Sequence, residues 1–278
     1  MALKKDVAHI YKTVCVSGET EGEDEFDTDH IGDILLHSEK AVVNRVGASG
    51  GQIDVEGEIA LNICVLKGDD SVCSYERLIP YKISLPSEEA FGRVTAGARV
   101  DVKSAHLEAG TDEEKGASHV LFSYTLSAEC FLTVADEISV AEDGFSTEAE
   151  TELKIQKDGG RYLTNLSKMT ERVGGEGIIS PAVEGDFTLQ AAVLPRAEIT
   201  CKKTERGFEA EGAVLAEVLL CGADGGYRSA TLSLPFVFPV DVEGDYVEAD
   251  CAVCGLNVRR KKNGEVEADA TLRLSSCL

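Results

Sequence analysis

The sequence predicts an all-β protein made of two tandem, related modules of sandwich-like or barrel-like form. Three observations support this prediction. Apolar residues alternate with polar ones over long segments, which is the period of a strand with one buried and one wet face. One such row occurs twice at a constant spacing. The 27 glycines and an Asn-Gly pair supply turns that suit a β protein.

The repeated row is the strongest of these signals. Its first copy has glycine at Gly57 and its second at Gly212, an offset of 212 − 57 = 155 residues. The offset holds further along, because 235 − 80 = 155 also separates Pro235 from Pro80. A repeat at fixed offset indicates modular architecture. Glycine on a strand leaves a notch for a close approach, and proline belongs at a strand end, edge or bend. We therefore interpret these four residues as structural.

The first module is predicted to cover residues 1–136. Alternation predicts strands over about 1–18, 34–46, 52–66, 72–82, 93–107 and 120–134. The last of these keeps period 2 over eight positions, from Val120 to Val134. Between the first two strands lies an acidic stretch, Glu19–Asp29, which we predict to be a solvated loop.

A connector is predicted over residues 137–190, with a strand at 147–157 and a short helix at 162–173. Leu163, Leu166, Met169 and Val173 suggest the helix because their spacing is roughly helical. The glycine-rich segment 173–177 is expected to end regular structure. The second module then covers residues 191–278. Its strands are expected at about 192–203, 207–220, 227–235, 246–258 and 265–274, with a hairpin turn at Asn263-Gly264.

The composition of the chain argues against several classes of function. The 278 residues carry a formal net charge of −23, from 27 basic and 50 acidic residues. This surface repels phosphate backbones, so we do not expect nucleic-acid binding. No apolar run approaches the ~18 residues of a membrane span, and the N-terminus lacks a secretory signal pattern. The nine cysteines suit reduced thiols, so we expect a cytoplasmic protein.

No motif for catalysis, cofactor or metal binding withstands inspection. Gly47–Gly51 has the letters of a hydrolase nucleophile elbow, but a strand follows where that motif needs a helix. Cys251 and Cys254 form a lone CxxC without a second ligand pair. Asp27 and Asp29 offer oxygen ligands, but the later residues of a calcium loop are missing. We therefore expect no enzyme activity, no cofactor and no metal.

A basic run is the sharpest local charge contrast. Arg259, Arg260, Lys261 and Lys262 precede the Asn-Gly turn, so we place them at an exposed hairpin tip. The tip is either simply solvated or a contact for an acidic partner. The acidic stretch with Asp27 and Asp29 in another copy of the chain would be one such partner, which allows a homo-oligomer.

Part of the sequence resembles a known family. The segment from Gln52 to Tyr81 contains VEGEIALNICVL, a polar turn and YERLIPY, and it is similar to the core of the SPOCS domain. The second copy carries AEGAVLAEVLL and SLPF in the same pattern, and Asp143–Thr147 resembles an element found between such domains. The family, which includes SipL-like proteins, occurs in sporulation and spore-coat morphogenesis. The further repeats and C-terminal LysM module that such proteins often carry are not found in this sequence.

The resemblance implies a non-enzymatic scaffold for spore-envelope assembly. Such a protein would act on the mother-cell side of the forespore surface, with other coat or morphogenetic proteins as partners. The alternative is a β module that binds a glycan or peptide without catalysis. That alternative predicts an aromatic-lined pocket, for which Tyr75, Tyr81, Phe122 and Tyr124 are available.

Overall fold

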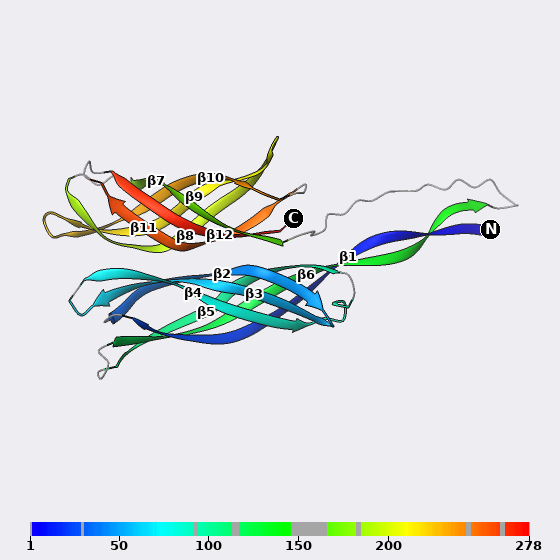
Figure 1. Ribbon diagram of the computed structural model, residues 1–278, viewed down its shortest axis with the longest axis horizontal. Coiled ribbons are helices and arrows are strands. Elements are labelled where there is room, and N and C mark those ends of the chain that lie inside the picture. Colours follow the sequence, from blue (N-terminus) through cyan, green and yellow to red (C-terminus); the bar gives the residue numbers. More distant parts are fainter. Residues whose placement is uncertain are drawn as a thin grey trace.

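The computed structural model describes residues 2–28, 31–69, 71–91, 94–112, 117–145, 166–181, 185–242, 246–261 and 265–277. Throughout these ranges the chain forms β-strands and no helix, which confirms the all-β fold class. The strands make up two elongated bodies that lie side by side (Figure 1). We call them the first half, β1 to β6, and the second half, β7 to β12.

The first half contains two antiparallel three-stranded sheets. Its strands are β1 (Ala2–Thr28), β2 (Ile31–Ser49), β3 (Gln52–Lys67), β4 (Val72–Pro86), β5 (Val94–Asp112) and β6 (Ala117–Phe145). The sheets have the orders β1-β6-β5 and β2-β3-β4. Their inner faces enclose one core, and its largest fully buried side chains are Phe122, Ile53, Ile59, Leu61, Ile79, Leu126 and Leu132.

The second half is one six-stranded sheet of order β11-β12-β7-β10-β9-β8. Its strands are β7 (Leu166–Ser180), β8 (Phe187–Thr204), β9 (Gly207–Gly222), β10 (Tyr227–Val240), β11 (Glu248–Arg260) and β12 (Val266–Cys277). The end strands β8 and β11 approach each other, so the sheet curls into a nearly closed barrel around its own core. β7 lies within the range predicted to be a connector.

The two halves share four strand pairings, to which the second half adds the pairing of β7 with β10. In the first half β6 pairs with β1 and β5, and β3 pairs with β2 and β4; in the second, β12 pairs with β7 and β11, and β9 with β8 and β10. Even an irregularity recurs. The β5–β6 register shifts between Val102 and Ser104, and the β11–β12 register shifts between Val253 and Gly255, which is 253 − 102 = 151 residues later.

The predicted helix at 162–173 is wrong for the residues described, because Leu166–Val173 belong to β7. β7 pairs with β12 from Leu166 to Gly177, and its last three residues pair with β10. Met169 and Val173 both pack against the core, and their spacing of four residues fits a helix face and a strand face equally well. The predicted strand at 147–157 lies outside the described residues.

The break expected at 173–177 is also wrong, since β7 continues through these glycines. A Cβ at Gly174 would meet the carboxylate of Asp269, and one at Gly177 would lie 2.5 Å from Leu232 Cδ1. The glycines therefore allow close approach of neighbouring side chains within the sheet rather than a turn.

The acidic stretch is not a loop, because β1 runs to Thr28 and pairs with β6. Five of its carboxylates occupy alternate, exposed positions: Glu19, Glu21, Glu23, Glu25 and Asp27. Asp24 is less exposed and pairs with Arg77. The intervening residues face inward, and Phe26 among them is buried. A Cβ at Gly18 or Gly22 would overlap Leu85 or Tyr124, so the glycines make room for the core.

Gly57 and Gly212 form notches, as their positions on the apolar row suggest. A Cβ on Gly57 would collide with the carbonyl oxygen of Val42 and the ring of Tyr81. A Cβ on Gly212 would collide with the carbonyl oxygen of Glu198, and it would lie 2.9 Å from the Phe236 ring. In both halves an aromatic side chain thus crosses the glycine of its neighbouring strand.

Candidate docking surfaces

The two halves meet through a small apolar cluster. Val42 on β2 and Ala60 on β3 pack against Ala252 on β11, with Leu78 and Cys254 at the margin. All three central residues are buried. They lie on the outer faces of their strands, because the alternate residues of β3 fill the core of the first half. The first half therefore uses the outer face of its β2-β3-β4 sheet as a protein-contact surface.

Ion pairs surround this cluster. Lys40 Nζ lies 2.9 Å from Asp250 Oδ2, and Arg99 Nη2 lies 2.8 Å from Glu248 Oε1. Arg273 on β12 pairs with Glu58 on β3, and these two side chains are only 18% and 23% exposed. Partial burial makes the Arg273–Glu58 pair the most important of the three, since exposed pairs contribute little.

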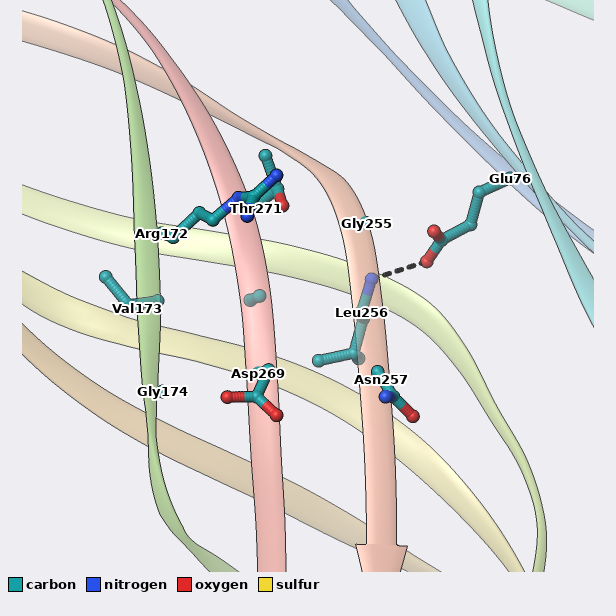
Figure 2. Close-up of a pocket in the computed structure, with 10 residues that line it drawn as sticks. Glu76, Arg172, Val173, Gly174, Gly255, Leu256, Asn257, Asp269 and Thr271 are labelled. Atoms are coloured by element: carbon teal, nitrogen blue, oxygen red, sulfur yellow. Dashed lines mark hydrogen bonds between the residues drawn. The ribbon is translucent and has the colours of Figure 1, made fainter.

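A groove opens beside this junction (Figure 2). It has a volume of about 490 Å³. Glu76 reaches it from β4 of the first half, and its Oε1 accepts a hydrogen bond of 2.6 Å from Leu256 N–H. Desolvation raises the pKa of Glu76, although its side chain keeps contact with solvent and the Leu256 bond acts in the opposite direction. Arg172, Asn257 and Thr271 line the same groove.

Pro80 and Pro235 occupy equivalent places on the outer faces of their halves. Pro80 pairs across the sheet with Glu58, and Pro235 pairs with Ala213. Both prolines are exposed. Glu58 lies in the junction between the halves, whereas Ala213 and Pro235 line an open groove of about 610 Å³.

The predicted basic tip is a hairpin end, because Arg260 pairs with Val266 across β11 and β12. Arg259 Nε donates to Glu267 Oε2 at 2.8 Å, and Lys261 Nζ lies 3.3 Å from Glu267 Oε1. These two cations lower the pKa of Glu267. Lys262 and the Asn-Gly turn lie outside the described residues. The charge of the tip is therefore partly balanced within the molecule.

Arg260 differs from its neighbours in the tip. Its Nη1 donates to the carbonyl oxygen of Phe187 at 2.7 Å, and its guanidinium stacks 4.2 Å from the centroid of the Phe187 ring. The Nη2 group also lies 3.3 Å from Asp186 Oδ1. These contacts fasten the end of β11 to the start of β8, so Arg260 has a structural role.

The second predicted contact residue, Asp27, ends the row of exposed carboxylates on β1. His119 lies between two of them, with Nε2 at 2.6 Å from Glu25 Oε1 and Nδ1 at 3.4 Å from Asp27 Oδ1. Glu21 and Glu23 form no ion pair or hydrogen bond with any described residue. Asp29 falls outside the described ranges. Among the described residues, Asp27 pairs with His119 and the basic tip pairs with Glu267 and Asp186, so no ion pair joins Asp27 to the tip.

The aromatic residues considered for a ligand pocket belong to the first core. Tyr81 and Phe122 are buried, and Tyr75 and Tyr124 pack against the same cluster. The Tyr81 hydroxyl donates to the Val42 carbonyl at 3.2 Å, and burial raises its pKa. These side chains support the fold and are not arranged around a pocket.

Burial favours the neutral form of two thiols, those of Cys130 and Cys251. Burial raises the pKa of Cys130 to about 11 and that of Cys251 to about 12. Cysteine reactivity depends on the thiolate, so neither side chain is an activated nucleophile. Over the described part of the chain, no three His, Cys, Asp or Glu side chains gather as metal ligands. The same residues contain no helix that could cross a membrane.

Sequence inspection missed the junction residues Lys40, Glu58 and Arg273. A signal was nevertheless present on the outer face of β3, where Asp54, Glu56 and Glu58 give way to uncharged residues. Ala60, Asn62 and Cys64 continue that face, and all three are buried. Loss of charge along an otherwise wet face indicates a contact surface.

Comparisons of this chain with family models, curated proteins and solved structures find no match.

Proposed function

We propose that this chain is a non-enzymatic assembly protein that acts through contacts between its outer sheet faces and other proteins. The observation that carries this proposal is the junction between the halves. There, the outer face of the β2-β3-β4 sheet holds another β body through an apolar centre ringed by ion pairs. The module occurs twice in the chain, and one copy already binds a β body through this outer face. The equivalent face of the other copy is therefore suited to binding another protein.

The resemblance of Gln52–Tyr81 to the SPOCS domain supports a role in spore-envelope assembly. On this proposal the protein acts at the forespore surface, on the mother-cell side, and its partners are coat or morphogenetic proteins. The row of exposed carboxylates on β1 would favour a basic partner surface, because complementary charges steer association. Glu21 and Glu23 are the members of the row without an ion-pair partner among the described residues.

A pull-down of the tagged full chain from sporulating cells tests the proposal. The wild type should retain coat proteins, and the variant Glu21→Gln/Glu23→Gln should retain less of any basic partner, more clearly at low salt. Glu205→Gln/Glu209→Gln is the matched control, since it removes two exposed carboxylates elsewhere. A wild-type chain that retains no coat protein would refute the assembly role.

Binding of a peptide or glycan is the second candidate. It is favoured by the 490 Å³ groove, where Arg172 has no ion-pair partner among the described residues and Glu76, Asn257 and Thr271 offer further polar groups. Peptide and glycan arrays probed with the wild type and with Arg172→Ala separate the candidates. Binding that disappears in Arg172→Ala supports a ligand site, and no binding by the wild type rejects it.

A further inference from the structure

The second half exposes an apolar surface that its equivalent in the first half does not. Ile178 and Val237 are 59% and 68% exposed, and Pro235 is exposed between them. The register places Ile178 and Leu215 on either side of Ser233, and Ala213 beside Pro235. We call the surface of Ile178, Ala213, Leu215, Pro235 and Val237 the open face. A contiguous apolar surface on a strongly charged protein indicates a contact site.

The equivalent surface of the first half is covered. The offset of 155 relates Ala213 to position 58 and Leu215 to position 60. Glu58 pairs with Arg273 of the second half, and Ala60, which is 3% exposed, packs on Ala252. We propose that the open face binds a second copy of this chain, forming a two-fold symmetric dimer. This inference deepens the assembly function proposed above and rests on it.

Charge opposes the other way in which copies could associate, a head-to-tail repeat of the internal junction. In that junction Lys40 lies 2.9 Å from Asp250. The strand registers relate Lys40 to Arg196, by 196 − 40 = 156, and Asp250 to Arg99, by 250 − 99 = 151. A head-to-tail contact would therefore place Arg196 of one copy against Arg99 of the next.

A second pair of positions gives the same result. Val42 packs on Ala252 in the internal junction. The same registers relate Val42 to Glu198, by 198 − 42 = 156, and Ala252 to Asp101, by 252 − 101 = 151. Head-to-tail association would bring these two carboxylates together. Arg99 and Asp101 already pair with Glu248 and Lys40 inside the chain, which reduces the repulsion. The head-to-tail mode still gains no pair of opposite charges at these positions, so it is disfavoured relative to a mode that does.

A two-fold contact pairs opposite charges instead. Arg196 lies beside Leu215 and Glu198 lies beside Ala213. A two-fold axis that crosses β9 between Leu215 and Ala213 places Arg196 of each copy opposite Glu198 of the other, and Leu215 opposite Ala213. Symmetry makes this ion pair form twice over one self-complementary surface.

The same axis brings Glu211 of one copy toward Glu217 of the other. Both carboxylates already have partners within the chain, since Glu211 pairs with Lys202 and Glu217 accepts a hydrogen bond of 3.3 Å from Thr231. These partners reduce the repulsion between the two acids.

The area of the open face determines how strongly the two copies can associate. Four strands about 4.8 Å apart and roughly ten residues long at ~3.3 Å each give about 600 Å² per copy. The total of about 1,200 Å² is at the lower end for specific interfaces, so we expect a reversible dimer.

Sedimentation velocity of the full chain from about 1 to 200 µM tests the proposal. The mass should rise with concentration from 29.7 kDa toward twice that value. Val237→Glu should stay monomeric, because it adds a carboxylate beside Glu211 of its own copy and toward Glu217 of the other. Tyr227→Glu is the control, since Tyr227 lies on the same strand, is 60% exposed and is outside the open face. Circular dichroism checks that both variants are folded.

A charge swap tests the arrangement itself. Arg196→Glu should abolish the dimer, and Arg196→Glu/Glu198→Arg should restore it. A wild type that is monomeric over the whole range overturns the proposal, and so does a dimer that tolerates both Val237→Glu and Arg196→Glu. Either failure leaves the pull-down of coat proteins unaffected, so it is distinguishable from failure of the assembly function.

Discussion

Substitution of Gly57 by alanine tests whether the notch is essential to the fold. The added methyl group would occupy space taken by the Val42 carbonyl oxygen and the Tyr81 ring. Overpacking of a well-packed site costs about 1–3 kcal/mol. Displacing Tyr81 also breaks its hydrogen bond to Val42, worth about 1 kcal/mol. We therefore expect Gly57→Ala to lower the free energy of unfolding by about 2–4 kcal/mol.

Thermal and urea denaturation followed by circular dichroism measure this loss. At about 2–4 °C per kcal/mol for a domain of this size, Tm should fall by roughly 4–16 °C. Gly47→Ala is the control, because no atom lies within 4 Å of a Cβ there. The control should be neutral or slightly stabilising, since alanine restricts the unfolded chain.

The equivalent substitution Gly212→Ala sharpens the test. It meets the Glu198 carbonyl and the Phe236 ring, but Phe236 has no hydroxyl group to lose a hydrogen bond. Its cost should therefore be smaller than that of Gly57→Ala by about 1 kcal/mol, and Tyr81→Phe alone should reproduce that difference. If Gly57→Ala remains within about 0.5 kcal/mol of the wild type, the notch argument is wrong.

Three other perturbations have defined outcomes. In urea denaturation, Arg260→Ala should lower the free energy of unfolding by about 2 kcal/mol, because a charged donor to the Phe187 carbonyl is lost. Arg259→Ala should lower it by less than about 0.5 kcal/mol, because its ion pair is exposed. Equal effects would contradict the structural role of Arg260. Glu58→Ala and Arg273→Ala should each lower the free energy of unfolding by about 2–4 kcal/mol, and the double variant should lose less than the sum of the two. A coupling energy below about 0.5 kcal/mol in this double-mutant cycle would show that the pair does not hold the halves together. The thiols of Cys130 and Cys251 keep their protons to higher pH in the folded state than in the unfolded one. Their contribution to stability should therefore be complete below pH about 9 and decline as pH rises from there toward 11–12. If the urea stability of Cys130→Ala/Cys251→Ala declines with pH as steeply as that of the wild type, these thiols are not the cause.

Most strands could be predicted because a half-buried sheet imposes its period on the sequence. From Ile53 to Val65, every second residue points to the inner face, and each of these residues is buried. The constant offset of 155 then predicted strands of the same kind in β9 and β10. Both signals are local or periodic, so they are visible without knowing what the strand packs against.

Features that depend on distant partners could not be predicted in this way. The acidic end of β1 looks like a loop until β6, about a hundred residues away, is seen to pair with it. Likewise, Val173–Gly177 looks like a break until Asp269 and Leu232 occupy the space that larger side chains would need. In each case tertiary contacts overrode the local preference of the residues involved.

The candidate docking surfaces follow a different rule from the fold. Inner positions keep the same character in both halves, as Gly57 and Gly212 show by accepting an aromatic ring each. Outer positions diverge, because Val42 and Ala60 of the junction correspond to Glu198, beside the open face, and to Leu215 within it. A shared core thus preserves one strand arrangement, while different outer residues give each half its own partner. The exchange of Val42 for Glu198 is the decisive difference, since a carboxylate at that position opposes a repeat of the internal junction and favours an arginine from a second copy.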